Sequence, residues 1–188
     1  MTFNDSSISR RSALTGLGVA ALAGAAATQA QAQNQEAKPL AGKVAIVSGS
    51  RKNMGRAVAV KLGQMGADVV VHYHRAETKD QAEEYARLVE AEGARAALKV
   101  GDLGQIENVR AMYDTAEQSF GGVDIVLNHA GAILKKPLAE LSDEEFERLD
   151  AINNRALFYS LREAATRLRD GGRIINTGTS LLAGAAPG

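Results

Sequence analysis

The chain has 188 residues, 45% of them hydrophobic, and its 22 basic residues balance 22 acidic ones, so the formal net charge is zero. This length and apolar content are typical of one folded domain with a core, and the neutral charge argues against a nucleic-acid-binding protein or a disordered tail. Cysteine is absent, which excludes disulfides, thiolate catalysis and cysteine-based zinc sites, and the three histidines show no helical pairing with Glu, so no metal site is predicted.

The first 32 residues contain the three parts of an export signal. Arg10 and Arg11 precede an uncharged run, residues 13–28, that is shorter than a membrane span requires. The segment ends in Ala30-Gln31-Ala32, whose small side chains suit signal peptidase. The Arg pair resembles the twin-arginine type, which exports folded proteins. We therefore expect a signal peptide over residues 1–32, a linker over 33–42, no stable membrane anchor and a periplasmic location. A disordered leader on a cytoplasmic protein is the alternative.

A strand, a glycine turn and a helix follow the linker. Val44–Val47 is an apolar run rich in β-branched residues, and helical spacing resumes at Arg56. Between them, Gly49 and Gly55 permit left-handed backbone and close approach of a ligand. Asn53 stands where a middle glycine is expected, and Asn tolerates the left-handed region. The turn's N–H groups and the helix dipole predict a phosphate site, and a βα turn without a ligand is the alternative.

Strands and helices alternate through the rest of the chain. Apolar runs predict four further strands, over residues 68–75, 94–100, 123–127 and 173–176. Helical spacing predicts the helices between them, and capping boxes open two of these helices at Thr78 and Ser142, the second running to about residue 168. This alternation indicates an α/β fold with a doubly wound parallel sheet. We predict a Rossmann-like dinucleotide-binding domain over residues 43–188 that is truncated after about its fifth strand.

The charges near the second strand bear on which dinucleotide is bound. This strand ends in His74-Arg75, with no Asp or Glu to accept hydrogen bonds from a ribose diol. A cation at that place pairs with a 2′-phosphate, and Lys52 in the glycine turn adds a second cation. Together these residues favour NADP over NAD, although each one alone is also compatible with a solvated surface charge.

Five motifs occur in the order and spacing of the short-chain dehydrogenase/reductase family, which the chain resembles over residues 40–188. They are Ser48-Gly49-x-x-x-Asn53-x-Gly55, Asp102-Leu103, Asn128-x-Ala130-Gly131, Asn153 within Ala151-Ile152-Asn153-Asn154, and Gly172-Arg173-Ile174-Ile175-Asn176. The His-Tyr-His-Arg sequence at residues 72–75 and the missing middle glycine resemble the pteridine reductase branch of that family.

The resemblance implies NADP(H) as the cofactor and a set of residues around it. The glycine turn would line the pyrophosphate, Lys52 and Arg75 would hold the 2′-phosphate, and Asp102-Leu103 would flank the adenine. The segment that starts at Asn128 would pass beside the nicotinamide ribose. The implied cofactor-binding residues are Gly49, Arg51, Lys52, Asn53, Met54, Gly55, His74, Arg75, Asp102, Leu103, Asn128, Ala130 and Gly131.

The resemblance also implies hydride transfer between nicotinamide and a small-molecule carbonyl or alcohol substrate. Asn153 would match an active-site Asn that interrupts helical hydrogen bonding and holds a water for proton relay; an ordinary mid-helix Asn is the alternative. The family's Ser, which polarises the substrate carbonyl, falls on Thr179, with Ser180 adjacent. Either hydroxyl can donate that hydrogen bond.

The sequence departs from the family at the proton donor, a Tyr followed four residues later by a Lys that lowers the phenol's pKa. None of the four tyrosines, Tyr73, Tyr85, Tyr113 and Tyr159, has Lys at that spacing. In the family the pair follows the Ser position, so we expect a chain truncated before it and inactive alone. Three interpretations remain: the amino-terminal portion of a carbonyl reductase or alcohol dehydrogenase, a non-catalytic dinucleotide-binding module, and an unstable fragment with an open fifth strand. The family is usually homo-oligomeric, partly through a later helix, and the substrate is not predicted.

Overall fold

The computed structural model describes residues 38–50 and 53–179, so the predicted signal peptide and residues 33–37 of the linker lie outside the described residues. Arg51, Lys52 and Ser180 lie outside them as well. The described part contains a sheet of five strands: β1 Val44–Val47, β2 Asp68–Tyr73, β3 Ala96–Val100, β4 Val123–Asn128 and β5 Leu168–Asn176.

The strands lie in the order β3-β2-β1-β4-β5, and every neighbouring pair is parallel. β1 is central: Ile46 pairs with Val70 of β2 on one side and with Val126 of β4 on the other. The chain winds outwards from β1 to β3 and then returns to place β4 beside β1. This topology confirms the predicted doubly wound α/β fold.

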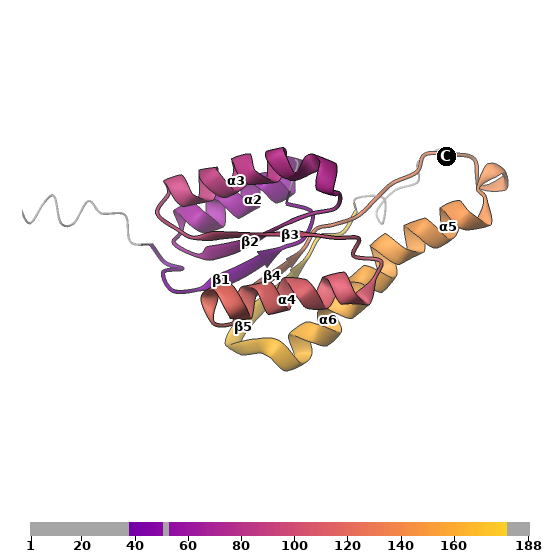
Figure 1. Ribbon diagram of the computed structural model, residues 1–188. Coiled ribbons are helices and arrows are strands. Elements are labelled where there is room, and N and C mark those ends of the chain that lie inside the picture. The colour runs from indigo at the N-terminus through magenta and orange to yellow at the C-terminus, as the bar shows by residue number, and fades with distance from the viewer. Residues whose placement is uncertain (1–37, 51–52, 180–188) are drawn as a thin grey trace, which may run out of the picture. The chain divides into compact units, whose positions relative to one another are not determined.

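Helices cover both faces of the sheet (Figure 1). α2 Asn53–Gln64 packs with α3 Lys79–Ala91 on one face, and α4 Ile106–Phe120 packs with α6 Ala156–Arg167 on the other. Because side chains alternate along a strand, Val44 and Ile46 join the core with α4 and α6, whereas Val47 joins the core with α2 and α3. All four residues of β1 are buried, as expected for a strand that is covered on every side.

One of the two predicted capping boxes is confirmed. Before α5, Asp143–Asp150, the Ser142 hydroxyl accepts a hydrogen bond from the Glu145 N–H at 3.2 Å, and Glu145 Oε2 accepts one from the Ser142 N–H at 3.0 Å. The box predicted at Thr78 is wrong. Thr78 closes a 3-10 turn, η1 Ala76–Thr78, and its hydroxyl donates to the Arg75 carbonyl at 2.8 Å. A local bond to the preceding backbone has replaced the helix cap.

The helix predicted over residues 142–168 is not one uninterrupted α-helix. After the 3-10 turn η2 Leu138–Glu140, α5 runs to Asp150, and a π turn, η3 Ala151–Arg155, joins it to α6. In this turn the Ala156 N–H donates to the Ala151 carbonyl, five residues back instead of four.

β5 begins at Leu168, before the predicted start at Arg173, and its pairing with β4 is irregular. The register shift lies at Asp124, opposite residues 169–172. The Arg169 guanidinium holds this irregularity in place by donating to the Asp124 carboxylate at 3.0 Å. The predicted strand over residues 173–176 is therefore the second part of β5.

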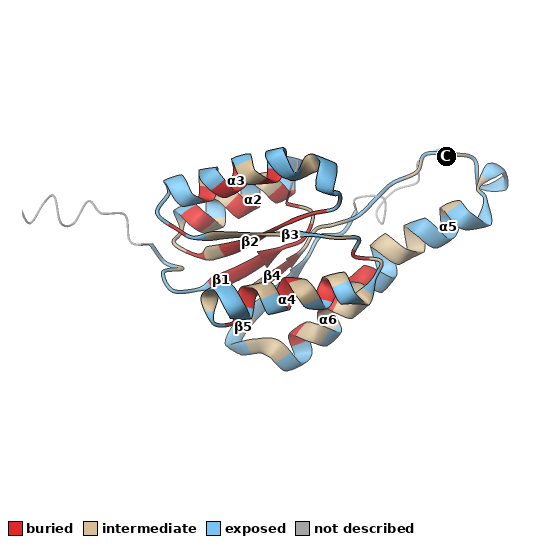
Figure 2. Cartoon of the chain, in the orientation of Figure 1, coloured by how far each residue is buried: buried red, intermediate tan, exposed pale blue. Residues whose placement is uncertain are grey.

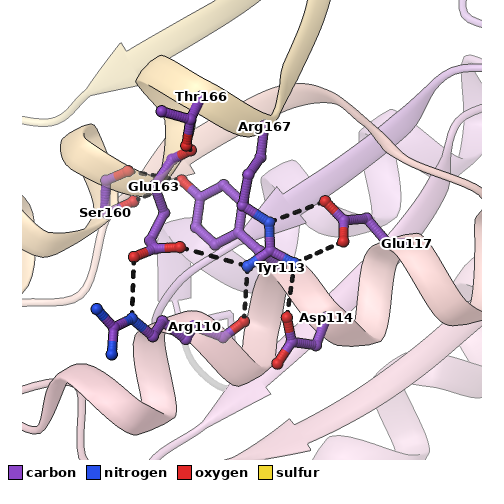
Figure 3. A network of polar contacts seen from close by, with 8 residues as sticks. All are labelled: Arg110, Tyr113, Asp114, Glu117, Ser160, Glu163, Thr166 and Arg167. Carbon is purple, nitrogen blue, oxygen red and sulfur yellow. Dashed lines mark hydrogen bonds and ion pairs between the residues drawn. The ribbon is translucent and has the colours of Figure 1, made fainter.

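A network of polar side chains joins α4 to α6 (Figure 3). The Arg167 guanidinium lies over the Tyr113 ring and pairs with Asp114 and Glu117, both at 2.6 Å. The Tyr113 hydroxyl donates to the Ser160 carbonyl at 2.8 Å, and burial raises the pKa of this phenol to about 12. The hydrogen bond to Glu117 raises the pKa of Arg167 still further above neutrality. These contacts hold α6 against α4.

Candidate functional site

The carboxyl ends of all five parallel strands lie at one edge of the sheet, where the predicted site residues follow them. At this edge β1 and β4 are neighbours, although the helices that follow them in the chain cover opposite faces. Ser48 joins the two strand ends: its buried Oγ accepts hydrogen bonds from the His129 N–H at 2.9 Å and the Ala130 N–H at 3.0 Å. This is the topological switch point at which doubly wound sheets bind ligands.

The turn after β1 is packed so closely that it requires glycine at two positions. Gly49 has φ +66°, and a Cβ there would lie 2.9 Å from the Ala130 Cα. A Cβ on Gly55 would lie 2.5 Å from the Gly49 carbonyl oxygen. Asn53, at the start of α2, has φ 47°, which confirms that Asn adopts left-handed backbone in place of a glycine. Asn53 and Met54 are both exposed, so side chains that solvent reaches lie at the first turn of α2.

A buried histidine of β2, His72, connects two turns at this edge, the one after β1 and the one after β3. The Gly49 N–H donates to His72 Nδ1 at 3.1 Å, and His72 Nε2 lies 2.9 Å from the Gly101 carbonyl. The Ser50 hydroxyl donates to the His72 carbonyl at 3.1 Å. Burial lowers the pKa of His72 to about 4, so the ring is neutral near pH 7. The signal in the sequence was a polar ring among the apolar residues of a strand, because a buried ring nitrogen must find a partner.

The residues predicted to face the adenosine end lie after β2 and β3. His74 and Arg75 are exposed immediately beyond β2. Asp102 is also exposed, and its Oδ1 accepts a hydrogen bond from the Gly104 N–H at 2.9 Å. Leu103 is 3% exposed and packs in the core, so its side chain is not available to a ligand at this edge.

The turns after β4 and β5 are bound to each other. Asn128 Nδ2 donates to Asn176 Oδ1 at 2.9 Å, and the Thr177 N–H donates to the Asn128 carbonyl at 3.0 Å. His129 Nδ1 lies 3.2 Å from the Thr177 hydroxyl. Ala130 is half-buried and Gly131 exposed. The predicted ribose-side segment is therefore held by contacts with both of its neighbouring strands.

Asn153 lies in the π turn, so the predicted break in α-helical hydrogen bonding is present. Its side-chain amide holds the loop after β4: Oδ1 accepts from the Ala132 N–H at 3.0 Å, and Nδ2 donates to the Ala132 carbonyl at 2.9 Å. Its predicted part in proton relay stays a prediction. Thr179 is exposed after β5, the last described residue before Ser180.

The described surface also has a hollow away from the strand ends. It has a volume of about 520 Å³ and is an open groove along α2 and α3, lined by Asn53, Arg56, Ala57, Val60, Lys61, Gln64 and Leu88. We locate the site by the strand ends instead, because the close turns and the predicted residues meet there. Within residues 38–50 and 53–179, no cluster of His, Asp and Glu suits a metal ion, and no helix has the length and apolarity to span a bilayer.

Known proteins share this sequence pattern over most of the chain. The model of the family described as short chain dehydrogenase matches residues 43–186. Versicolorin reductase 1 from Dothistroma septosporum is 40% identical over 141 residues, which cover 75% of this chain and 53% of that protein. A short-chain type dehydrogenase/reductase from Picea abies is 39% identical over 154 residues, which cover 77% of this chain and 56% of that protein. The chain thus spans about half the length of these curated relatives.

Solved structures share the fold as well. A short chain dehydrogenase from Burkholderia cenocepacia in complex with NADP superposes with a TM-score of 0.73 at 33% identity, covering 77% of this chain and 58% of that one. A blue fluorescent protein from a metagenomic library, in complex with NADPH, gives a TM-score of 0.73 at 36% identity, covering 77% and 59%. With its strand order, its glycine turn at the switch point and a family match over residues 43–186, the chain belongs to the short-chain dehydrogenase family.

Proposed function

We propose that this chain binds NADP(H) and forms the dinucleotide-binding portion of an oxidoreductase. The observation that carries the proposal is the turn after β1, where Gly49 and Gly55 leave no room for a Cβ and Asn53 is left-handed. Such a turn brings backbone N–H groups and the start of α2 close to a pyrophosphate. The solved relatives in complex with NADP or NADPH support the choice of ligand.

The exposed cation at the end of β2 supports NADP(H) over NAD(H). Arg75 and His74 are both exposed there, and no carboxylate follows the strand directly. A guanidinium can bind a 2′-phosphate with two hydrogen bonds, whereas a ribose diol needs an acceptor. Arg75 is therefore the residue we assign to the 2′-phosphate, and we assign Lys52 of the glycine turn to the same role from the sequence alone.

The reaction we propose is hydride transfer between the nicotinamide and the carbon of a small-molecule carbonyl or alcohol. The bound cofactor supplies or accepts the hydride. Asn153, through its hold on Ala132, fixes the loop beside the nicotinamide ribose, and the hydroxyl of Thr179 or Ser180 donates a hydrogen bond to the substrate oxygen. A proton must also reach that oxygen during reduction, and the 188 residues contain no Tyr-x-x-x-Lys pair to deliver it.

A second candidate is a module that binds the dinucleotide without turnover. Losing a general acid costs a factor of about 10² to 10⁴ in rate. We expect this chain to bind NADPH and to show no measurable oxidation of NADPH with simple ketones or aldehydes. Steady NADPH oxidation by the purified chain would favour the first candidate over the second.

A fluorescence titration of the full chain with NADPH and NADH tests the cofactor assignment. We expect tighter binding of NADPH, and we expect Arg75→Asp to weaken NADPH binding tenfold or more while leaving NADH binding nearly unchanged. Arg87→Asp is the matched control, because it makes the same charge change at an exposed position of α3. Equal affinities of the wild type for NADPH and NADH would contradict the 2′-phosphate assignment.

We also propose that residues 1–32 export the protein through the twin-arginine route to the periplasm. The support is the sequence alone, namely the Arg10-Arg11 pair, the uncharged run and the small residues at its end. Replacing both arginines by Lys retains the charge and removes the pair. Cell fractionation should then show the unprocessed chain in the cytoplasm, and unchanged processing of the double variant would contradict this route.

A further inference from the structure

His72 occupies a position that no other side chain of the described residues shares. Its ring contacts the backbone of the turn after β1, at Gly49, and the backbone of the turn after β3, at Gly101. Its own strand leads within two residues to His74 and Arg75. The ring is 3% exposed, and its carbonyl is also engaged, by the buried Ser50 hydroxyl. One buried imidazole thus touches or precedes three segments that the proposed function assigns to the cofactor.

The two backbone partners define the protonation of the ring. The Gly49 N–H can only donate, so Nδ1 must present its lone pair, and the Gly101 carbonyl can only accept, so Nε2 must carry the hydrogen. The neutral Nε2–H tautomer alone satisfies both partners. A second proton on Nδ1 would point at the Gly49 N–H and break that contact.

The surroundings of the ring keep it in this neutral form. Burial is the main cause of its low pKa, and Coulombic repulsion from His74, just beyond β2, and from Lys99 of β3 acts in the same direction. The hydrogen bond to Gly101 and the Asp102 carboxylate act in the opposite direction and are outweighed. The ring is therefore a fixed hydrogen-bonding spacer over the whole neutral range of pH.

We propose that His72 is a positioning residue for the dinucleotide, which sets the separation between the pyrophosphate turn at Gly49 and the adenine-side turn at Gly101. This inference rests on the proposed function. The Gly49 N–H is directed into the protein at His72, so the ring fixes the orientation of the peptide that leads into the glycine turn. Because misplaced binding groups lose affinity steeply, a shift of this turn relative to Asp102 should be seen mainly in cofactor binding.

Three substitutions separate the two contacts. His72→Phe keeps a ring of similar size and removes both nitrogens. His72→Asn places a carbonyl oxygen near the position of Nδ1, so it retains an acceptor for the Gly49 N–H, whereas His72→Gln reaches the position of Nε2 and retains a donor for the Gly101 carbonyl. Tyr113→Phe is the matched control, since it also removes a buried hydrogen bond to a carbonyl, but between α4 and α6.

The test combines NADPH titration, urea unfolding and hydrogen exchange of the Gly49 amide, all on the full chain. We expect His72→Phe to weaken NADPH binding tenfold or more and to speed exchange at Gly49, and His72→Asn to restore both better than His72→Gln. Tyr113→Phe should lower stability to a similar extent with NADPH affinity unchanged. If His72→Phe does not fold, the comparison of Asn with Gln at position 72 decides.

Two results would overturn the inference while leaving the proposed function intact. In the first, the wild type binds NADPH and all His72 variants that fold bind it equally well. In the second, the His72 variants and Tyr113→Phe are destabilised equally, and their NADPH affinities also fall equally. Failure of the wild type to bind any nicotinamide dinucleotide would instead overturn the proposed function, whereas the exchange rate at Gly49 would still report on the contact with His72.

Discussion

β1 and β5 both contain apolar β-branched residues, but their surroundings are opposite (Figure 2). Every residue of β1 is buried, with Val47 at 0% exposure, because β2 and β4 flank it and helices cover both faces. β5 lies at the edge of the sheet, and its Ile174 and Ile175 are 39% and 49% exposed. Apolar β-branched residues thus form a core only where neighbours supply cover, and otherwise leave an edge open to association.

The helices also differ in how many residues they bury. α2, α3 and α4 each bury three or four residues, whereas α5 buries none and has its Phe146 side chain 56% exposed. Figure 2 shows α5 pale along most of its length and β1 red. The buried residues of the described part are therefore concentrated around β1 and its neighbours β2 and β4, with the helices packed on them, and α5 lies outside this core.

The largest expected effect comes from replacing an isoleucine by alanine in β1, compared with the same replacement in β5. Ile46→Ala removes a side chain that is 1% exposed and should lower the free energy of unfolding by about 3 kcal/mol, from lost burial and the cavity it leaves. Ile175→Ala, at 49% exposure, should cost less than about 1 kcal/mol. Urea unfolding followed by circular dichroism measures both, and equal losses would show that β5 is covered in solution.

The second effect is a pH dependence of the free energy of unfolding that arises from His72 of β2. The pKa of His72 is about 4 in the folded chain and 6.5 when unfolded, so on acidification the unfolded chain binds the proton first. The corresponding stability is complete above pH 6.5 and is lost as the pH falls towards 4, by about 2 kcal/mol at pH 5. Urea midpoints at pH 7.5 and 5.0 should therefore differ less in His72→Gln than in the wild type. Identical differences would contradict a buried neutral ring.

A third effect concerns the contact between α4 and α6, which Arg167 of α6 makes with Tyr113, Asp114 and Glu117 of α4. Arg167→Met keeps the packing over Tyr113 and removes the pairs with Asp114 and Glu117, which should lower the free energy of unfolding by about 1 to 2 kcal/mol. Arg167→Lys retains the positive charge but lacks the several donors of the planar guanidinium, so it should recover only part of the lost stability. Chemical unfolding of the three proteins at one pH makes the comparison, and full recovery by Lys would show that charge alone suffices.

The smallest effect should come from Ser142→Ala. This change removes the hydroxyl that accepts the Glu145 N–H, a cap worth about 1 kcal/mol to the helix it begins. Because α5 buries no residue, most of that loss should appear as fraying of α5 and little in global unfolding. Hydrogen exchange should speed up at residues 143–145 while the urea midpoint barely moves. A large shift of the midpoint would mean that α5 is coupled to the core.

The parts of the fold that the sequence predicts are those set by local pattern. The apolar run of β1, the two essential glycines and the Ser142 box each determine their local structure within a few residues. The alternation of strand and helix then indicates a doubly wound parallel sheet. Thr78 shows the limit of such reasoning, because its hydroxyl had a nearer partner in the Arg75 carbonyl. His72 shows another limit, since its partners Gly49 and Gly101 lie 23 and 29 residues away.

At the candidate site, the sequence predicts which residues follow the strand ends and does not predict which of them bond to one another. In the sequence Ser48 is only one residue of a motif, yet in the structure its hydroxyl joins the turns on both sides of the switch point. The family resemblance implies that Leu103 flanks the adenine, whereas in the structure its side chain lies in the core. The irregular start of β5 was equally hidden, because it depends on Arg169 meeting Asp124 from 45 residues away.

The π turn at residues 151–155 has a geometric consequence for the helix that contains it. The π turn contains one more residue than an α-helical turn, which rotates the following side chains by about 100° about the helix axis. The buried face of α6, formed by Ala156, Ser160 and Ala164, is therefore not in line with the corresponding face of α5. Deleting a single residue here would restore continuous α-helical hydrogen bonding and would rotate α5 and α6 relative to each other about the helix axis. Because Asn153 lies within this turn, the same deletion would also turn the amide that hydrogen-bonds the N–H and carbonyl of Ala132.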